Sequence, residues 1–541
     1  MERTWLKSYP AGVPADVDYG SYQSIADMFT DCMQTYKVRN AFTSTDGSLT
    51  FEEVGRLSRD FAAWLQAMGI GKGTRVAIML PNCLNYPVAL YGIIRAGCAV
   101  VNVNPQYTSR ELEHQLKDSG ARALVMLEES YPTLEAIRGV ERLEHVVLVT
   151  SGNPSRPNSA TRDSPLEGVC RLSDVLLKGA QLPFRPVNLG RDDVAFLQYT
   201  GGTTGSSKAA KLLHRNIVIN IEQAAAWFSP GFKGETPAIV TAMPLYHIFS
   251  LTVNCLLAMK LGGVNILIAN PRDIPAFVAA LRANPFNMIT GVNTLYNTLL
   301  NNADFRTLDF SGLRICAAGG MPLQKAVADE WKRVTGCPLL EGYGLTETSP
   351  CATMNPLDQD SYNGSVGLPM PSTYISIRNE SNEELPVGDF GEICIKGPQV
   401  MDGYWEQPDE TAKAISADGY LHTGDIGVMD RNGFLRIVDR KKDMIIVSGF
   451  NVYPTEIEQV IGMHPGVLEV AAVGVSDKHS GEAVKVYVVK KDPGLSAQAI
   501  FEHCSDKLTG YKRPKHVEFR AELPKSNVGK LLRRALRQDL S

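Results

Sequence analysis

Residues 199–211 read YTGGTTGSSKAAK and contain three glycines, three threonines and two lysines. Glycines allow tight turns and close approach of the backbone to a ligand, and the hydroxyl and ammonium groups can bind phosphate. The spacing differs from that of nucleotide hydrolases, in which Gly-Lys-Ser/Thr is contiguous, because two serines separate Gly205 from Lys208. A solvated linker is the alternative, but the preceding apolar run 194–197 predicts a buried strand that carries the loop. We therefore predict a phosphate loop that is not of the hydrolase type.

Four further stretches carry residue types that could complete such a site. Residues 319–322 (GGMP) allow close backbone approach, although alone they indicate only a turn. Residues 341–348 (EGYGLTET) combine glycines, an aromatic ring that can stack on a base, a hydroxyl and a carboxylate that can bind a cation. In DGYLHTGD the final Asp425 follows a glycine and suits two ribose hydroxyls, although a lone aspartate there is more often part of a turn. Lys530 follows a glycine in PKSNVGK, and a lone lysine in a tail is normally only solvated.

Composition limits the class of protein. A chain of 541 residues is too long to fold around one hydrophobic core, so two to four domains are expected. A formal net charge of -4 argues against a nucleic-acid partner. The ten cysteines show neither CxxC pairs nor His/Cys clusters, which favours a reducing compartment over a zinc site or a disulfide framework. The N-terminus lacks the apolar core of a signal peptide, and the longest apolar stretch, 248–259, is too short and too polar to span a bilayer. We predict a cytoplasmic protein, with peripheral membrane contact left open.

The periodicity of the first 440 residues predicts an α/β fold. Apolar runs at 75–80, 100–103 and 123–126 read as strands, and one of the intervening helices begins at Ser109. This alternation indicates βαβ units and parallel-type sheets flanked by helices, in which phosphate ligands lie beyond the strand ends.

The last hundred residues predict a small, mobile α+β domain. Two β-rich runs, 470–475 and 484–489, precede a helix and a basic tail. The charged stretch 439–443 is either a solvated surface turn or a hinge, and we favour the hinge because few apolar residues anchor it. The predicted domains are 1–440 and 441–541.

Taken in order, these stretches resemble the motifs of the adenylate-forming enzymes, which include acyl-CoA synthetases, luciferases and peptide-synthetase adenylation domains. YTGGTTGSSK resembles their phosphate loop, EGYGLTET their adenine-and-magnesium motif, LHTGDIG their ribose-binding aspartate, and PKSNVGKLLRRALR the tail with their catalytic lysine. Residues 418–442 are similar to the fatty-acyl-CoA synthetase signature. Together with WLKSYP, PLYHIF, NPRDIP and TGVNTLYN, they make the whole chain similar to bacterial long-chain fatty-acid–CoA ligases of β-oxidation.

The resemblance implies a two-step reaction. The fatty-acid carboxylate attacks the α-phosphorus of ATP to give an acyl-adenylate and pyrophosphate, and the thiol of coenzyme A then displaces AMP. Negative charge crowds around the triphosphate, so the site needs Mg²⁺, amide donors and lysine.

The resemblance also implies roles for individual residues. ATP or AMP would be bound by Thr200, Gly201, Gly202, Thr203, Thr204, Gly205, Lys208, Gly319, Gly320, Glu341, Gly342, Tyr343, Gly344, Thr346, Asp425 and Arg440. The catalytic residues would be Lys208, Thr346, Glu347 and Lys530, with Thr200 and Glu347 beside Mg²⁺. Tyr246, His247 and Ala318 would line the acyl pocket, although a packed histidine is the alternative for His247. Lys442 would be the hinge, and Ser448 and Gly449 would form the loop on the coenzyme A side.

Some positions depart from the family pattern. Ala209 and Ala318 stand where glycines are common, and the methyl group of Ala318 could narrow the mouth of the acyl channel. Tyr420, Met429 and Arg431 replace Trp, Trp and Pro of the signature. None of these changes removes a charged or coordinating group, so activity is expected.

Three alternatives and several details stay open. The chain could be a ligase for aryl or other acids, a domain that loads a carrier protein, or a non-catalytic acyl- or nucleotide-binding relative. No carrier segment follows residue 541, and the retention of Lys530, Glu347 and Asp425 argues against the non-catalytic reading. The expected partners are a fatty acid, ATP and coenzyme A, with no nucleic acid. Contact with the inner membrane, a homodimer, the preferred chain length, and a degradative or biosynthetic role are left undecided.

Overall fold

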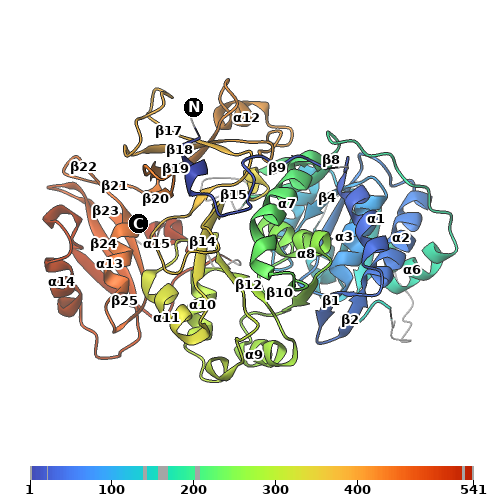
Figure 1. Cartoon of the computed structure of the whole chain (residues 1–541), viewed down its shortest axis with the longest axis horizontal. Coiled ribbons are helices and arrows are strands. Elements are labelled where there is room, and N and C mark those ends of the chain that lie inside the picture. The colour runs from blue at the N-terminus through green and yellow to red at the C-terminus, as the bar shows by residue number, and fades with distance from the viewer. Residues whose placement is uncertain are drawn as a thin grey trace.

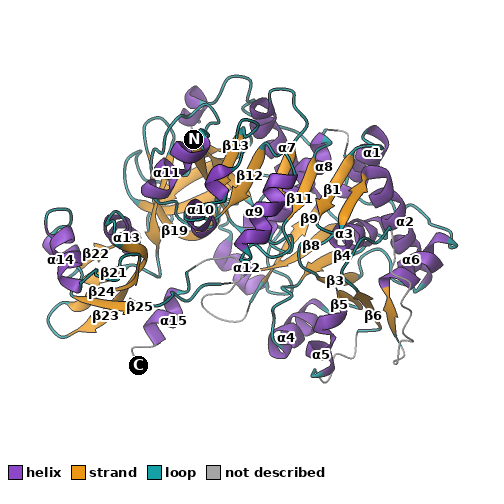
Figure 2. Ribbon diagram, turned by 90° about the horizontal axis from the view of Figure 1, so that it is seen from below, coloured by secondary structure: helices purple, strands orange, loops and turns teal. Residues whose placement is uncertain are grey.

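A computed structural model describes residues 3–20, 22–137, 143–155, 168–200, 207–526 and 531–538. Three sheets lie in the large N-terminal part and a fourth in the smaller C-terminal part, which Figure 1 shows in orange and red at one end of the molecule. In Figure 2, helices flank the strands of the two large sheets. The predicted α/β fold is therefore confirmed.

The seven-stranded sheet has the order β7-β6-β5-β3-β4-β8-β9. Its strands are β3 (Arg75–Met79), β4 (Ala99–Asn102), β5 (Ala123–Leu127), β6 (His145–Val149), β7 (Val169–Arg171), β8 (Val194–Tyr199) and β9 (Ala209–Leu213). All neighbours are parallel except β8 and β9, which are antiparallel. The strands predicted at 75–80, 100–103, 123–126 and 194–197 are β3, β4, β5 and β8.

Helices cover this sheet because their apolar faces pack on its strands. They are α2 (Phe51–Ala67), α3 (Asn85–Arg95), α4 (Ser109–Ser119), α5 (Tyr131–Glu135), α6 (Leu172–Ala180) and the short η2 (Glu128–Ser130). Apolar residues of α2 and α3 form one core with residues of β3 and β8. Helix α4 begins at Ser109 as predicted, since Thr108 and Glu111 cap it reciprocally.

The nine-stranded sheet has the order β16-β15-β14-β13-β12-β10-β11-β1-β2. Its strands are β1 (Asn40–Ser44), β2 (Gly47–Thr50), β10 (Ala238–Thr241), β11 (Val264–Leu267), β12 (Met288–Gly291), β13 (Ile315–Ala318), β14 (Leu339–Gly344), β15 (Cys351–Met354) and β16 (Leu368–Pro369). The central strands from β1 to β14 are parallel, and the pairs at both ends are antiparallel. Such a sheet needs helices on both faces.

The helices of this part are mostly short. They are α1 (Ile25–Thr35), α7 (His214–Phe228), η3 (Ser229–Phe232), the π-helix η4 (Ser250–Leu256), α8 (Leu257–Leu261), α9 (Ile274–Ala283), α10 (Asn293–Leu300), η5 (Phe305–Thr307), α11 (Lys325–Thr335) and η6 (Thr346–Thr348). Within the apolar stretch 248–259, residues 250–259 are buried in η4 and α8, and Phe249 before them is half-buried. Among the described residues, no helix has the length and apolar character that crossing a bilayer requires.

The third sheet is antiparallel, with the order β17-β18-β19-β20. It consists of β17 (Tyr374–Arg378), β18 (Gly391–Lys396), β19 (Leu421–Met429) and β20 (Leu435–Arg440), and α12 (Pro408–Ala414) precedes β19. The N-terminal helix η1 (Thr4–Ser8) packs against it: the Trp5 ring is 1% exposed and meets the Tyr374 ring edge-on, with centroids 6.5 Å apart. The Ser8 hydroxyl donates to the Asn432 carbonyl at 2.8 Å.

The C-terminal part forms its own sheet and core. It contains β21 (Ile445–Val447), β22 (Phe450–Val452), α13 (Pro454–Gly462), β23 (Val467–Asp477), β24 (Gly481–Lys490), α14 (Ala497–Ser505), η7 (Gly510–Lys512), β25 (His516–Arg520) and α15 (Arg533–Gln538). The strands predicted at 470–475 and 484–489 lie within β23 and β24, and apolar residues of α13 and α14 pack on this sheet. The α+β character is confirmed.

We predict that Trp5→Ala lowers the melting temperature by several degrees. Truncating a buried tryptophan typically costs about 3–5 kcal/mol, and here it would detach the N-terminal helix from the third sheet. Differential scanning calorimetry of the parent and the variant measures the effect. Trp5→Phe keeps an aromatic ring, so its melting temperature should fall much less. An unchanged melting temperature in Trp5→Ala would contradict the anchoring role of Trp5.

Candidate functional site

The predicted phosphate loop connects β8 and β9. The Thr200 amide donates to the Lys208 carbonyl at 2.9 Å, the Thr200 hydroxyl donates to the same carbonyl at 3.3 Å, and the Ser207 hydroxyl donates to the Thr200 carbonyl. These bonds join the two ends of the loop, so the hairpin fixes the place at which the loop leaves the sheet. Gly201, Gly202, Thr203, Thr204 and Gly205 lie outside the described residues.

Lys208 forms an ion pair that the sequence did not reveal. Its ammonium group contacts the carboxylate of Glu410, on α12, and lies 5.2 Å from the centroid of the Tyr404 ring. The bonds from Lys208 and Lys413 hold the pKa of Glu410 down to about 2, so this carboxylate is ionised at neutral pH. Glu410 is 202 residues from Lys208 in the chain, and no local pattern indicates the contact.

Glu347 belongs to η6, directly after β14, and contacts Tyr404 and Met401. Its Oε1 atom accepts a hydrogen bond from the Tyr404 hydroxyl at 2.8 Å, and its carbonyl accepts one from the Met401 amide at 2.8 Å. Thr346 is the first residue of η6. The structure therefore brings Lys208, which precedes β9, and Glu347, which follows β14, into contact with one tyrosine that sequence reasoning missed.

The two glycine-containing stretches lie on neighbouring strands. Strand β13 pairs in parallel with β14, with Ala318 opposite Glu341, so the turn at Gly319 and Gly320 lies beside the next residues of β14. A Cβ added at Gly319 would lie 3.4 Å from the Gly342 carbonyl and 3.6 Å from the Phe249 ring. A Cβ at Gly344 would lie only 1.8 Å from the Pro350 carbonyl, so no other residue fits this position.

Tyr343, Asp425 and Arg440 lie together, and their roles at adenine and ribose stay a prediction. The Tyr343 hydroxyl donates to Asp425 Oδ2 at 2.6 Å, and Arg440 Nε lies 3.6 Å from Asp425 Oδ1. Asp425 and Arg440 face each other in the register of β19 and β20. Burial, together with the charge of Asp425, raises the pKa of Tyr343 well above its ordinary value, so its phenol remains a donor. An aromatic ring and a carboxylate from two sheets thus form one polar cluster.

Glu341 is buried and turned toward the backbone. Its Oε1 atom accepts a hydrogen bond from the Leu323 amide at 3.0 Å, and its own carbonyl accepts one from the Asn355 side chain at 2.8 Å. Desolvation raises the pKa of this carboxyl to about 8. Glu341 is therefore mostly neutral at pH 7 and braces the turn that follows Gly320.

The proposed acyl-pocket segment spans the two large sheets. The Tyr246 carbonyl accepts a hydrogen bond from the side chain of Gln198, on β8, at 2.8 Å, and His247 Nδ1 accepts one from the Phe249 amide at 3.3 Å. Ala318 is the buried last residue of β13. Because Phe249 reaches Gly319 next to it, the segment 246–249 runs from the phosphate-loop strand to the 319–320 turn.

The hinge candidate Lys442 is exposed and lies between β20 and β21. The residues on either side are anchored: Asp439 Oδ2 accepts a hydrogen bond from the Thr455 amide at 2.8 Å, and Asp443 forms an ion pair with Arg537 at 3.2 Å. Of these two contacts, the Asp439–Thr455 bond crosses position 442 and would break on rotation there, whereas the Asp443–Arg537 pair lies within the C-terminal part and would persist.

The loop predicted on the coenzyme A side is a tight hairpin within the C-terminal part. Ser448 and Gly449 both have positive φ angles, 51° and 82°, as a two-residue turn with right-handed strand twist requires. The next residue, Phe450, is 55% exposed and stacks on Tyr511 with ring centroids 4.7 Å apart. Lys530 lies outside the described residues, while Lys525, five residues before it, and Leu531, directly after it, pair as an isolated antiparallel bridge.

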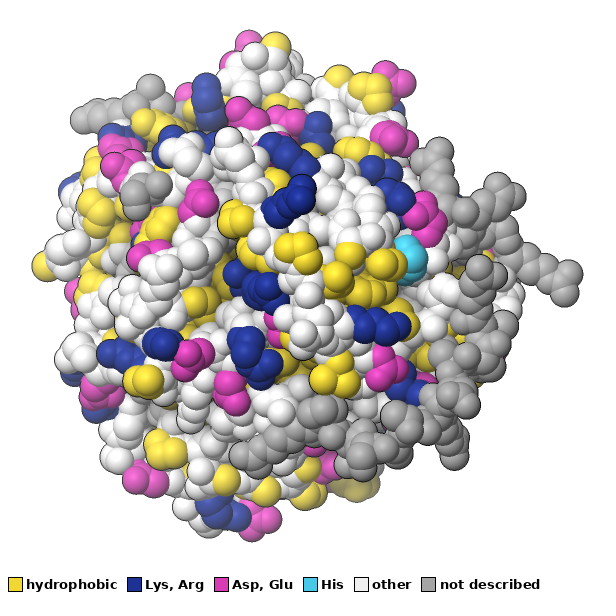
Figure 3. All heavy atoms as spheres, turned by 90° about the vertical axis from the view of Figure 1, so that its right-hand side faces the viewer, with side chains coloured by type: hydrophobic (Ala, Val, Ile, Leu, Met, Phe, Trp, Pro, Cys, Tyr) yellow, Lys and Arg dark blue, Asp and Glu magenta, His cyan; other side chains and the backbone are white. Residues whose placement is uncertain are grey.

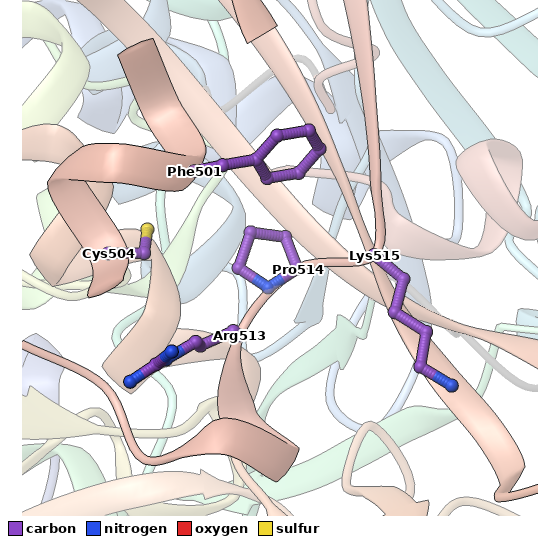
Figure 4. Close-up of a pocket in the computed structure, with 5 residues that line it drawn as sticks. All are labelled: Phe501, Cys504, Arg513, Pro514 and Lys515. Atoms are coloured by element: carbon purple, nitrogen blue, oxygen red, sulfur yellow. The ribbon is translucent and has the colours of Figure 1, made fainter. Parts of the chain in front are cut away.

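A hollow of about 350 Å³ in the C-terminal part is separate from these clusters. Figure 4 shows its basic residues, Arg513 and Lys515, pointing to opposite sides of Pro514. Arg513 donates to the Leu508 carbonyl at 2.8 Å, beyond the end of α14, and Lys515 contacts Asp477 at 3.2 Å. These cations already have partners and do not converge on one point.

Charges on the face of the molecule in Figure 3 are mixed. The face of the N-terminal part in Figure 3 shows Lys and Arg interspersed with Asp, Glu and small apolar groups. Within the described ranges, no three His, Cys, Asp or Glu side chains gather as a metal site would need.

Comparison with protein families identifies two matching regions. Residues 29–405 match the AMP-binding enzyme family, and residues 456–530 match the AMP-binding enzyme C-terminal domain. Curated relatives include a long-chain-fatty-acid–CoA ligase of Escherichia coli O6:H1, which is 52% identical over 100% of this chain and 98% of its own length. The ligase of the same name from Haemophilus influenzae is 46% identical over 100% of this chain and 99% of its own length. A feruloyl-CoA synthase of Amycolatopsis sp. is 33% identical, covering 91% of this chain and 94% of its own.

Solved structures share the fold over nearly the whole chain. The anthranilate CoA ligase AuaEII in complex with anthranoyl-AMP has a TM-score of 0.87 and 25% identity, covering 97% of this chain and 99% of that one. ATP-bound MatB from Rhodopseudomonas palustris has a TM-score of 0.84 and 30% identity, covering 95% of this chain and 98% of that one.

We predict that Glu341→Gln removes a pH dependence of stability. The folded-state pKa of about 8 lies above the ordinary value of 4.5, so the unfolded chain loses this proton first. Stability is then lost as pH rises from about 4.5 to 8, by at most ~1.4 kcal/mol per pH unit. The melting temperature of Glu341→Gln, relative to that of the parent, should be higher at pH 8.5 than at pH 5. For the exposed control Glu380→Gln, the change in melting temperature should be the same at both pH values. An equal change at both pH values for Glu341→Gln would contradict the raised pKa of Glu341.

Proposed function

The chain belongs to the AMP-binding enzyme family, and from this premise we propose that it joins a long-chain fatty acid to coenzyme A with the cleavage of ATP to AMP and pyrophosphate. The observation that carries the substrate assignment is the 52% identity, over the full length of this chain, to a ligase named for that reaction. Two groups of contacts support it: Tyr343 bonds to Asp425, as a stacking ring and a ribose-type carboxylate would, and Glu347 and Lys208, as a cation ligand and a phosphate-binding lysine, both contact Tyr404.

In the first half-reaction an oxygen of the fatty-acid carboxylate forms a bond to the α-phosphorus of ATP, and the bond from that phosphorus to the bridging oxygen breaks to release pyrophosphate. The Thr200–Lys208 loop would hold the β- and γ-phosphates, and the Lys208 ammonium would exchange Glu410 for phosphate oxygens. Thr346 would contact the α-phosphate, and Lys530 would bridge it to the carboxylate. Preorganised donors of this kind stabilise charge where it accumulates in the transition state.

The residues present fit Mg²⁺ as the accompanying cation. Magnesium is usually bound by one or two carboxylates together with substrate phosphates and water, and Glu347 with the Thr200 hydroxyl would supply that protein share. When bound, the cation would offset the negative charge of the triphosphate. The adenine would lie between Tyr343 and the 319–320 turn, and the ribose hydroxyls would bond to Asp425, with Arg440 alongside.

The second half-reaction requires a different arrangement. The thiol sulfur of coenzyme A attacks the acyl carbon and AMP leaves, so the position held by Lys530 must be vacated. We assign ATP and fatty-acid binding to 1–440, and the catalytic lysine and the 448–449 hairpin to 441–541, with rotation at Lys442. The change of sheet after β20 and the separate hydrophobic core of the C-terminal part support this division.

The acyl chain would enter beside Tyr246, His247 and Ala318. The position of 246–249 between the phosphate-loop strand and the 319–320 turn supports this, because the fatty-acid carboxylate must reach the α-phosphate. Since fatty acids partition into lipid while ATP and coenzyme A are cytoplasmic, we place the enzyme in the cytoplasm with peripheral contact at the inner face of the membrane.

Pyrophosphate release tests the substrate class. With palmitate and ATP we expect about one equivalent of pyrophosphate per enzyme without coenzyme A, and continuous release once coenzyme A is added. Octanoate should be used less well, and benzoate and ferulate should give little release. Faster turnover of ferulate than of palmitate would contradict the long-chain assignment and favour an aryl-acid ligase.

We predict that Lys442→Pro separates the two half-reactions. Proline fixes φ near -65° and restricts rotation, so the domain movement should slow while the adenylation arrangement persists. Single-turnover pyrophosphate release should stay within a few-fold of the parent, and transfer from acyl-adenylate to coenzyme A should slow by at least about tenfold, as expected when a gating motion limits the rate.

Lys530→Ala is the reciprocal control for this hinge experiment. It should lose acyl-adenylate formation while keeping thioester formation from supplied acyl-adenylate. Equal losses in both steps for Lys442→Pro would indicate a general folding defect, and normal overall turnover would exclude Lys442 as the hinge.

A further inference from the structure

Residues 401–405 lie along β9 as an additional extended segment that sequence reasoning did not predict. The Lys211 amide donates to the Gly403 carbonyl at 2.8 Å, the Asp402 amide donates to the Lys211 carbonyl at 3.1 Å, and the Trp405 amide donates to the Ala209 carbonyl at 2.9 Å. Tyr404 is thereby paired with β9, the strand that leaves the phosphate loop. Its position depends on backbone bonds and not on its own side chain.

The Tyr404 side chain contacts both charged groups of the nucleotide site. Its hydroxyl donates to Glu347 Oε1 at 2.8 Å, and its ring centroid lies 5.2 Å from Lys208 Nζ. The same segment also holds the Glu347 backbone, because the Met401 amide donates to the Glu347 carbonyl at 2.8 Å. Glu347 is therefore fixed at its backbone and at one carboxylate oxygen by residues only three positions apart.

This arrangement suits a carboxylate that must bind a cation. One oxygen accepts the phenol hydrogen, which restrains rotation of the carboxylate and leaves the other oxygen for a metal ion. A lysine in its place would neutralise the charge that attracts the cation, whereas a phenol orients the carboxylate and leaves its charge intact. Partners of metal ligands commonly act in this way.

We propose that Tyr404 is a positioning residue, whose hydroxyl orients Glu347 toward the divalent cation that accompanies ATP. The proposal deepens the function proposed above and rests on it for the identity of the nucleotide. Tyr404 does not touch the reacting atoms. Its loss should therefore change how the reaction rate depends on Mg²⁺ concentration, and should not lower the rate equally at every concentration.

The test compares Tyr404→Phe with the parent in the full-length protein. Phenylalanine keeps the ring beside Lys208 and removes only the hydroxyl. Palmitate-dependent pyrophosphate release, measured against free Mg²⁺ at fixed ATP, should show an activation constant for Mg²⁺ raised by about 10- to 100-fold, the usual effect of removing a partner of a metal ligand. At saturating Mg²⁺ the rate should return to within a few-fold of the parent.

A matched control loses a phenol hydrogen bond elsewhere. Tyr9 donates to the Pro369 carbonyl, far from this segment in the chain, so Tyr9→Phe should lower the melting temperature slightly and leave the Mg²⁺ activation constant unchanged. If Tyr404→Phe keeps the parent's Mg²⁺ dependence, or loses rate equally at every Mg²⁺ concentration, the proposal is wrong.

A second readout does not depend on turnover. Binding of Mn²⁺ in the presence of ATP, followed by electron paramagnetic resonance, should be weakened in Tyr404→Phe by a similar factor. A parent protein that binds Mn²⁺ and ATP but releases no pyrophosphate with any acid would contradict the proposed function and leave this comparison valid. Equal Mn²⁺ binding in parent and variant would overturn the role of Tyr404.

Discussion

The hydrogen bond from the Tyr343 phenol to the Asp425 carboxylate is the contact on which the arrangement of the site depends. Tyr343 lies on β14 of the nine-stranded sheet, next to its last residue, while Asp425 lies on β19 of the four-stranded sheet. A buried carboxylate is costly unless its hydrogen bonds are satisfied, so the two sheets are held where the phenol and Arg440 can reach it. Because Arg440 ends β20, the same contact fixes the point from which the C-terminal part departs.

The positive charge of Lys208 is balanced by a carboxylate that the phosphate groups of a nucleotide could replace. Lys208 is neutralised by Glu410, and both side chains are about one-third exposed, at 34% and 32%. Ion pairs exposed to this extent contribute little to stability, so phosphate can replace Glu410 at small cost. Glu347 is held by a phenol, which brings no charge of its own to the site. The protein thus presents one exchangeable cation and one oriented anion, which is what a triphosphate with its metal ion requires.

Local patterns were enough to predict much of the fold. Strands β3, β5 and β8 are short apolar runs bounded by turns, and helix α4 begins where Thr108 and Glu111 can cap it. The contacts of Tyr404 could not be predicted, because the residue reaches Glu347 across 57 positions through an extended segment without periodicity. For the same reason the sequence motifs predicted which residue types form the site, while their partners became visible only when the three sheets were assembled.

The exchange of labelled pyrophosphate into ATP tests the central claim, that this chain forms an acyl-adenylate before coenzyme A takes part. With palmitate and Mg²⁺ but without coenzyme A, we expect label from pyrophosphate to appear in ATP, and no exchange when palmitate is omitted. This result requires that the acid and ATP form an acyl-adenylate and pyrophosphate reversibly. Exchange that depends on coenzyme A, or cleavage of ATP to ADP and phosphate, would contradict the account.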